Sequence, residues 1–157
     1  MGVGASFAEA FAKAQMSAGE TMPSGGRVFI SVRDRDKPTA VDIAVQLSRV
    51  GFEILATDGT ADVIAKAGVN VRVVNKVRQG RPHIVDMLKN DEIDLIINTT
   101  EGARATADSF SIRRTALERR IAYATTVAGG ACMAIAIEAS GQLMVSRLQD
   151  LHKEMAA

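Results

Sequence analysis

The sequence predicts an α/β domain of three layers, α/β/α, in which a five-stranded parallel sheet is covered by helices on both faces. Three observations lead to this prediction. From residue 27 onward, short apolar runs rich in branched residues alternate with stretches of helical period. The connections between them are short, and right-handed crossovers between parallel strands leave few topologies. Hydrophobic residues make up 47% and charged residues 24% of the 157 residues, as in globular domains.

Five segments have the pattern of buried strands. Near-continuous apolar runs of this kind are typical of parallel strands, because these strands are covered on both faces. The expected strands are residues 27–32, 52–56, 71–74, 94–98 and 121–124.

The segments between and after these strands have helical period. In the first, Pro38 lies in the first turn and Gly51 follows the last residue, which are common start and stop signals of helices. The expected helices are residues 38–50, 61–67, 83–89, 109–120, a segment after Thr126, and 144–155.

The first 26 residues are predicted to be distinct from the domain at 27–157. Four residues form an apolar stripe on a short helix, namely Phe7, Ala10, Phe11 and Ala14. Residues 17–26 are rich in glycine and serine and contain a proline, which is typical of a linker. The stripe either packs on the domain itself or is covered by polypeptide outside this chain.

Composition and charge exclude several classes of function. Nineteen basic residues against eighteen acidic ones give a net charge of +1, and aromatic residues make up only 4%, so we expect no nucleic-acid partner. No apolar run reaches the length of about 18 residues that a membrane span requires, and the first residues lack the order of a signal peptide. We therefore expect a cytoplasmic protein without a membrane partner.

The metal-ligating residue types are sparse. The single cysteine, Cys132, excludes an intramolecular disulfide and a zinc site built from thiolates. His83 and His152 are far apart in the sequence, and we expect both on the surface rather than as metal ligands. The sequence therefore predicts no metal site.

Polar residues follow four of the predicted strands, beyond their carboxyl ends. In parallel sheets, ligands bind beyond these ends, near the point where the strand order reverses. Hydroxyl, amide and ammonium groups suit a phosphorylated small ligand, because they donate hydrogen bonds to phosphate and sugar oxygens. The residues are Ser31, Lys37, Thr57, Thr60, Lys76, Asn98, Thr99 and Thr100.

Each of these turns also has a purely structural interpretation. The charges of residues 33–37 can pair with one another in a solvated turn, and Thr57 and Thr60 are of a type that often caps helices. The turn at 125–130, after the fifth strand, has two threonines and two glycines, and we expect it to join the same site. The convergence of several such turns favours a ligand site.

Five segments resemble one family in order and in spacing. They are VFISVRDRDK (28–37), FEILATDGTA (52–61), VNKVRQGRPHI (74–84), INTTEG (97–102) and IRRTA (112–116). They closely resemble the carboxyl-terminal regulatory domain of the large chain of glutamine-dependent carbamoyl phosphate synthetases, which belongs to the methylglyoxal synthase-like superfamily. The resemblance implies the strand order 3-2-1-4-5, with a reversal between strands 1 and 4. Residues 7–15 (FAEAFAKAQ) also resemble the end of the preceding synthetase domain.

The resemblance implies an allosteric, nucleotide-binding function. In the bacterial enzymes of this family, uridine monophosphate (UMP) inhibits and inosine monophosphate (IMP) activates. The two nucleotides thereby control the synthesis of carbamoyl phosphate from glutamine, bicarbonate and ATP for pyrimidine and arginine biosynthesis. Carried over residue by residue, the matching positions are the eight polar residues above. Lys37, Thr57, Thr60 and Lys76 would bind phosphate, and Asn98, Thr99 and Thr100 would contact ribose or base.

The resemblance also implies partners outside this chain. They are the synthetase domains of its own large chain, the glutaminase small chain of the holoenzyme, and further copies in an oligomer. It implies no cofactor for this domain, whereas the full enzyme would use ATP with magnesium or manganese. Family members that bind ornithine have an acidic residue after the tyrosine of the fifth strand. Here Tyr123 is followed by Ala124, which cannot pair with an ammonium group, so we do not expect ornithine to act.

Two other functions compete with effector binding. A methylglyoxal synthase, which eliminates phosphate from dihydroxyacetone phosphate, could use the same crevice but needs a carboxylate base. Arg81 stands near the position of that enzyme's catalytic aspartate, and the neighbouring Asp86 is displaced along the helix. We therefore prefer a domain that is not catalytic by itself, although it would be part of a ligase. The third hypothesis is a purely structural or oligomerisation domain.

Overall fold

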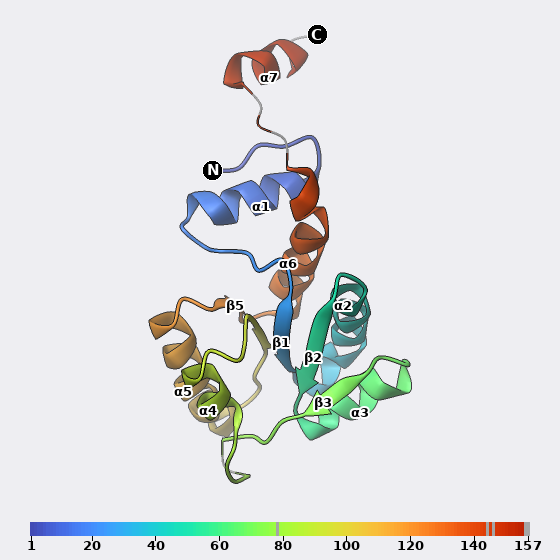
Figure 1. Ribbon diagram of the computed structural model, residues 1–157, viewed down its shortest axis with the longest axis vertical. Helices are drawn as coiled ribbons and strands as arrows, with labels where there is room; N and C mark the ends of the chain where they lie inside the picture. The colour runs from blue at the N-terminus through green and yellow to red at the C-terminus, as the bar shows by residue number, and fades with distance from the viewer. Residues whose placement is uncertain (78, 144, 146, 156–157) are drawn as a thin grey trace.

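Five parallel strands form one sheet in the order β3-β2-β1-β4-β5 (Figure 1). The computed structural model describes residues 1–77, 79–143, 145 and 147–155 of the chain. The strands are β1 (Gly26–Ser31), β2 (Phe52–Ala56), β3 (Val71–Val73), β4 (Leu95–Asn98) and β5 (Ala122–Ala124). This confirms the predicted fold class and strand order.

The central strand β1 is where the strand order reverses. On one side it pairs with β2, and on the other it pairs with β4. The last pair of the β1–β4 ladder places Ser31 opposite Asn98. Two of the predicted site residues are therefore neighbours at the carboxyl end of the sheet.

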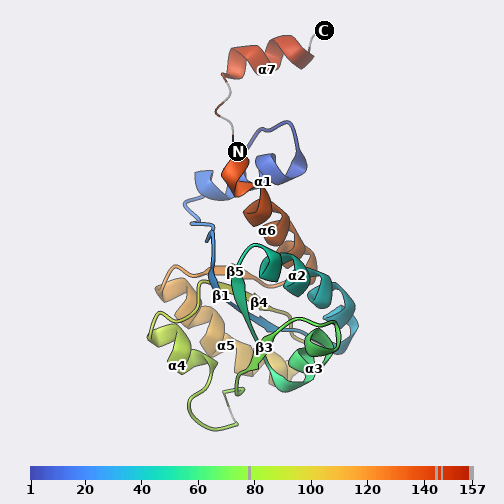
Figure 2. The same ribbon diagram turned by 45° about the vertical axis from the view of Figure 1, so that its right-hand side comes forward.

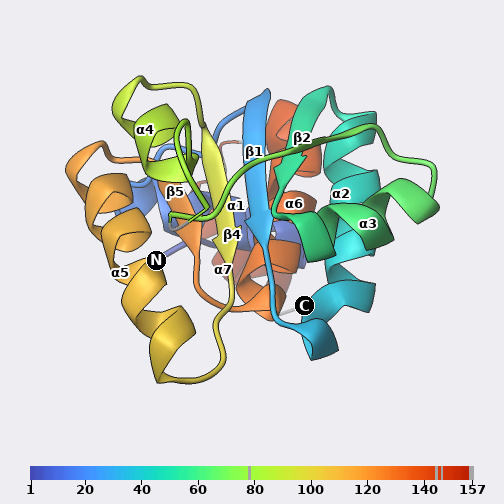
Figure 3. The same ribbon diagram turned by 90° about the horizontal axis from the view of Figure 1, so that it is seen from below.

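Helices cover both faces of the sheet (Figure 3). One face carries α2 (Lys37–Arg49), α3 (Asp58–Lys66) and α6 (Val127–Ala139), and the other carries α4 (Ile84–Lys89) and α5 (Ala103–Glu118). Two short 3₁₀ helices, η1 (Asp34–Asp36) and η2 (Ser140–Gln142), and a last helix, α7 (Leu148–Met155), complete the described elements.

Alternation along β1 explains why the sheet has two cores. Val28 and Ile30 point into the cluster formed with α2, α3 and α6, whereas Phe29 points into the cluster formed with α4 and α5. All three side chains are fully buried. Each contributes about 1.5–3 kcal/mol through removal of its apolar surface from water, so the central strand anchors both layers.

The close packing of α6 on the sheet depends on a glycine. A Cβ atom added to Gly130 would lie 2.9 Å from Cγ2 of Ile97 in β4. That distance is shorter than real contacts of this kind, so a larger residue at position 130 would push α6 away from the sheet. Thr126 fixes the start of the same helix, because its hydroxyl accepts a hydrogen bond from the backbone N–H of Gly129 at 3.0 Å.

Three helices begin three or more residues away from the predicted start, whereas α2 and α4 begin within one residue of it. Helix α3 begins at Asp58 instead of residue 61, and α5 begins at Ala103 instead of residue 109. The sequence has no apolar stripe over the first two turns of α5, and the described side chains there, residues 105–107, are not buried, so periodicity could not reveal these turns. Helix α7 begins at Leu148, and residues 144 and 146 of the predicted helix lie outside the described residues.

The amino-terminal helix α1 (Phe7–Ser17) packs against α6. Phe11 lies against the core cluster, and Ala10 and Ala14 are partly buried, so three of the four residues of the predicted stripe are at least partly covered within this chain. Ala12, which is outside the stripe, is buried. Phe7 stacks on Phe11, with ring centroids 5.8 Å apart, but stays 60% exposed. The division of the chain at residues 26 and 27 remains a prediction.

Helices α1 and α7 lie at one end of the molecule, beyond the start of β1 (Figures 1 and 2). The carboxyl ends of the strands are at the opposite end. Within the described ranges of the chain, no helix is both long enough and apolar enough to cross a lipid bilayer.

Candidate functional site

A cavity of about 500 Å³ opens at the carboxyl ends of β1 and β4. Its position follows from the topology, because loops leave two adjacent strands in opposite directions where the strand order reverses. The polar residues of its lining are Ser31, Arg33, Asp34, Thr57, Lys76, Asn98, Thr99, Thr100, Glu101 and Ser109, and the apolar ones are Phe29, Val32, Val77, Ile84, Ala105 and Ile112.

Six of the eight predicted site residues line this cavity, namely Ser31, Thr57, Lys76, Asn98, Thr99 and Thr100. The other two, Lys37 and Thr60, lie beside it at the amino end of α3. The ammonium group of Lys37 lies next to Gly59 of α3: a Cβ atom added to Gly59 would be 3.4 Å from Nζ of Lys37. Thr60 is buried, and its hydroxyl accepts a hydrogen bond from the backbone N–H of Val32 at 3.3 Å.

Hydroxyl groups link the turn after β1 to the start of α3 and to the end of β4. The Oγ atom of Ser31 and the Oγ1 atom of Thr57 are 3.2 Å apart, which links β1 to the start of α3. The backbone N–H of Arg33 donates to Oγ1 of Thr99 at 3.2 Å, which links the same turn to the end of β4. Although Thr57 is the N-cap residue of α3, its side chain makes no capping bond. Thr57 therefore has the predicted cap position, but its hydroxyl is not used for capping.

Asn98 presents an unpaired donor. The residue is only 3% exposed, and its Nδ2 atom is buried without a hydrogen-bond partner among the described residues. A buried donor left unpaired costs about 1–3 kcal/mol. Because Asn98 lines the cavity, an oxygen atom of a bound ligand would supply the missing acceptor.

A buried carboxylate, that of Asp36, holds two residues of the cavity lining in place. Asp36 is 7% exposed, and its Oδ2 atom accepts a hydrogen bond from Nε of Arg33 at 2.7 Å. Burial raises the pKa of the Asp36 carboxyl, but hydrogen bonds from Thr99 and Arg33 outweigh burial and hold that pKa below its ordinary value. Thr99 thus donates to Asp36 and accepts from Arg33, which fixes the orientation of its hydroxyl. Sequence reasoning allowed for charge pairs in this turn but missed the burial of Asp36 and its bond with Thr99, because an alternating charged run is equally typical of a solvated turn.

The mouth of the cavity carries opposite charges. The Nζ atom of Lys37 is 2.8 Å from Oδ1 of Asp34, whose side chain is 94% exposed. The hydrogen bond from Lys37, and then its charge and that of Lys76, lower the pKa of the Asp34 carboxyl. The interpretation of this turn as a set of internally paired charges is therefore correct for the pairs Asp34–Lys37 and Arg33–Asp36.

The apolar residues of the cavity lining were not predicted as part of the site. Ile84 and Ile112 come from α4 and α5, and their apolar character indicates only a core position. The signal that could have found them is the expected crossover of these helices over β4, which brings one side of each helix to the strand ends. A lining that combines polar groups with apolar side chains suits a ligand with an anionic group and a flat ring.

The turn after β5 does not line the cavity, contrary to the prediction that it joins the site. Strand β5 is at the edge of the sheet and is separated from β1 by β4. Thr125 and Thr126 are exposed there, and the hydroxyl of Thr126 is used to cap α6. Sequence reasoning assumed that all strand ends contribute equally, whereas the cavity is lined by residues from the ends of β1 and β4 and from the loops after β2 and β3, but not from the turn after β5.

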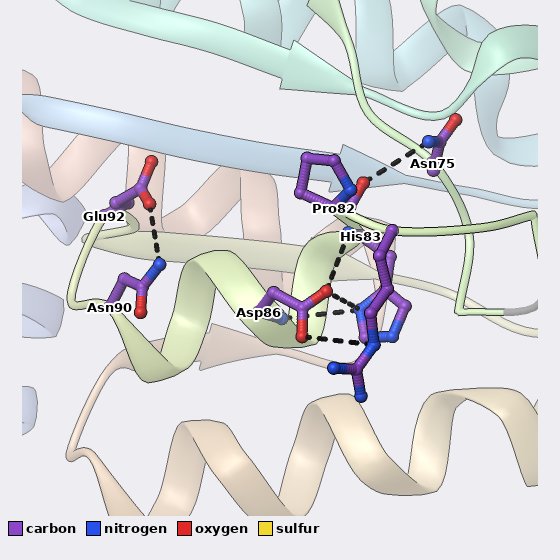
Figure 4. A network of polar contacts seen from close by, with 7 residues as sticks. Asn75, Pro82, His83, Asp86, Asn90 and Glu92 are labelled. Atoms are coloured by element: carbon purple, nitrogen blue, oxygen red, sulfur yellow. Dashed lines mark hydrogen bonds and ion pairs between the residues drawn. The ribbon is translucent and has the colours of Figure 1, made fainter.

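His83 and Asp86 form a reciprocal cap at the start of α4 (Figure 4). The backbone N–H of His83 donates to Oδ2 of Asp86 at 3.1 Å, and the backbone N–H of Asp86 lies 3.4 Å from Nδ1 of His83. His83 is 8% exposed, so its predicted surface location is wrong. Asp86, the carboxylate considered as a catalytic base, is outside the cavity lining and is engaged in this cap.

Figure 4 also shows how the neighbouring loop is closed. The Nδ2 atom of Asn75 donates to the carbonyl oxygen of Pro82 at 3.3 Å, and the backbone N–H of Ile84 donates to the carbonyl oxygen of Asn75 at 3.4 Å. The loop that carries Lys76 is thereby held at both ends. Among the described residues there is no group of three or more histidine, cysteine or acidic side chains that could hold a metal ion.

Comparison with known proteins agrees with this geometry. A family model described as "MGS-like domain" matches residues 39–125. The chain is 57% identical over all of its 157 residues to the carbamoyl phosphate synthase large chain of Pseudomonas putida. It is 53% identical over 155 residues, 97% of the chain, to that of Halomonas eurihalina. The chain spans only 15% and 14% of the length of these two relatives.

A solved structure has a similar fold. The protein in "Crystal structure of ForH" superposes with a TM-score of 0.52 over 77% of this chain and 83% of that chain, at 17% sequence identity. At that identity the likeness extends to the fold alone.

Proposed function

This chain belongs to the MGS-like domain family, and on that basis we propose that it is the regulatory domain of a carbamoyl phosphate synthase large chain. In this role the cavity binds a nucleoside monophosphate and performs no chemistry on it. The expected effectors are UMP as inhibitor and IMP as activator. A ligand regulates only through different affinities for two states of the whole enzyme, so the effect on catalysis would appear in the synthetase domains.

The observation that carries this proposal is the unpaired, buried Nδ2 atom of Asn98 in a cavity lined by both polar and apolar side chains. A nucleoside monophosphate has the complementary parts. Its phosphate and sugar supply acceptors for Asn98 and the hydroxyl groups, and its base supplies a flat surface for the apolar side chains.

We assign the phosphate to the amino end of α3. Helix α3 has nine residues, and free backbone N–H groups at its start favour an anion. Lys37, Thr57 and Thr60 surround that end, and Lys76 approaches from the loop after β3. Asn98, Thr99 and Thr100, at the end of β4, then face the ribose or the base.

The partners in this proposal are those of a large chain of this kind. The synthetase domains would form carbamoyl phosphate from glutamine, bicarbonate and ATP for pyrimidine and arginine biosynthesis, and a small glutaminase chain would supply ammonia. ATP and its magnesium or manganese ions would bind to the synthetase domains and not to this chain.

A thermal-shift measurement tests the proposal. We expect UMP and IMP to raise the melting temperature of the chain, by an amount that grows with the logarithm of their concentration. At 100 times the dissociation constant, the ligand adds about 2.7 kcal/mol to the free energy of unfolding. Uridine and inosine, which lack the phosphate, are the matched controls and should have little effect. The proposal is wrong if UMP, IMP and adenosine monophosphate all leave the melting temperature unchanged at millimolar concentration.

A further inference from the structure

The exposed carboxylate of Asp34 occupies the cationic corner of the site. Its Oδ1 atom is 2.8 Å from Nζ of Lys37. Lys76 also acts on this carboxylate, because its charge helps to lower the pKa of Asp34. The two lysines to which we assign a phosphate thus both interact with an anion that belongs to the protein.

We propose that Asp34 is a built-in counter-ion that competes with the phosphate of the ligand for Lys37 and so sets the affinity of the site for anions. This inference rests on the proposed function, since it concerns the same cavity. The other site residues strengthen ligand binding, whereas Asp34 weakens it.

The two partners of this ion pair differ in their freedom to move. The Lys37 side chain is 23% exposed, and its ammonium group lies over Gly59 at the amino end of α3. The Asp34 side chain is 94% exposed. An incoming phosphate can therefore replace the carboxylate, which turns into solvent, while Lys37 stays at the helix end.

The second carboxylate of the same turn cannot play this role. Asp36 is 7% exposed and is held by Arg33 and Thr99. Its displacement would leave a buried charge without partners, which is far more costly than the displacement of an exposed one. The turn therefore contains one fixed carboxylate, which holds residues of the cavity lining in place, and one exchangeable carboxylate, which faces the ligand.

The size of the effect follows from the exposure of the pair. Exposed ion pairs are weak, and loss of the competing carboxylate should tighten anion binding by about two- to fivefold. The gain should be largest for a dianionic phosphate at low ionic strength, because salt screens exposed charges. It should be small for the nucleosides, which have no phosphate to compete.

Calorimetric titration of the 157-residue chain with UMP, IMP and inorganic phosphate tests this inference. Asp34→Asn removes the competing charge and keeps the shape of the side chain. Asp58→Asn is the matched control, because Asp58 is an exposed aspartate at the start of α3 and has no ion pair with Lys37 among the described residues. We expect Asp34→Asn to bind UMP about two- to fivefold more tightly than the unmodified chain, and Asp58→Asn to change the affinity by less.

Three results would count against the inference, and they can be told apart. Unchanged or weaker binding by Asp34→Asn, with normal binding by the unmodified chain, overturns the role of Asp34 and leaves the proposed function intact. Equal gains in both variants show that net charge, not competition for Lys37, sets the affinity. If neither the unmodified chain nor the variant binds any phosphate compound, the proposed function itself is wrong.

Discussion

The hydroxyl oxygens of Ser31 and Thr57 are 3.2 Å apart, so the end of β1 and the start of α3 meet directly at the edge of the cavity. Thr57 is 4% exposed, and Ser31 is partly exposed. Since either hydroxyl can donate, the pair can present a donor or an acceptor to a ligand by rotation of two protons. This adaptability distinguishes the pair from Thr99, whose hydroxyl is fixed by Asp36 and Arg33.

The first prediction concerns the hydroxyl of Thr57. Thr57→Val removes it at nearly constant volume and leaves Ser31 without this partner. We expect UMP binding to weaken by at least about tenfold, because a hydrogen bond to a charged phosphate is worth about 1.5–3 kcal/mol. Calorimetry measures the change, and Thr39→Val, at an exposed position in the first turn of α2, is the matched control. A folded Thr57→Val chain with unchanged affinity would show that this hydroxyl serves only the link to β1.

The second prediction concerns Lys37. Lys37→Ala removes the ammonium group at the amino end of α3 and should weaken monophosphate binding by about 1.5–3 kcal/mol. Lys66→Ala, in the last turn of the same helix, is the control for loss of one positive charge. Calorimetry that finds the same affinity in the Lys37→Ala and unmodified chains would remove Lys37 from the phosphate site.

The third prediction separates binding from stability at Asn98. Asn98→Leu replaces an amide whose Nδ2 atom has no partner in the described structure. We expect the free energy of unfolding to change by less than about 1 kcal/mol, because no hydrogen bond of that atom is lost. Affinity for UMP should fall by at least about tenfold, because the donor for the ligand is gone. Urea unfolding and calorimetry on the same variant give both numbers, and a large loss of stability would contradict this assignment.

The fourth prediction concerns acid stability. The backbone N–H of His83 donates to Asp86 and lowers the pKa of that carboxyl from its ordinary value of 3.8. A carboxyl whose pKa is lower in the folded than in the unfolded chain stabilises the fold above its ordinary pKa, and this contribution is lost as the pH falls through the lowered value. Asp86→Asn should therefore be less stable than the unmodified chain at neutral pH, and the difference should shrink below about pH 3.8. Urea unfolding across this range measures it, and a difference that does not depend on pH would contradict the assignment.

The fifth prediction concerns catalysis. Incubation of the chain with dihydroxyacetone phosphate should yield no methylglyoxal above the uncatalysed rate. Asp86 is engaged in the cap of α4, and Asp34, in the cavity, has a lowered pKa that makes it a weak proton acceptor. Steady production of methylglyoxal that is abolished by Asp86→Asn would reverse our preference for a binding domain.

Much of the fold could be predicted because the strands are buried on both faces. Continuous apolar runs such as residues 95–97 have no polar face, which distinguishes them from surface segments. All five strands were predicted to within one residue at each end. The order of the strands came from the resemblance and not from the pattern. The start of α5 could not be predicted, because the described residues of its first turns lie in the cavity lining (Ala105) or are exposed (residues 106 and 107) and so give no core pattern.

Part of the candidate site could be predicted for a similar reason. Residues just after β1, β2 and β4, such as Thr57 and Asn98, must lie at one end of the sheet once the strands are parallel. The contacts of Asp36 and His83 could not be predicted. Both depend on backbone N–H groups or on side chains that only the turn geometry brings within reach. A charged run or a lone histidine looks the same with and without such partners.

The central strand β1 has only six residues between the linker from α1 and the edge of the cavity. At about 3.3 Å per residue, this is roughly 20 Å of backbone. Because β1 has hydrogen bonds to neighbours on both sides, it cannot slide without breaking two ladders at once. It therefore forms a rigid connection between Ser31, at the edge of the cavity, and Gly26, at the end of the sheet where α1 lies.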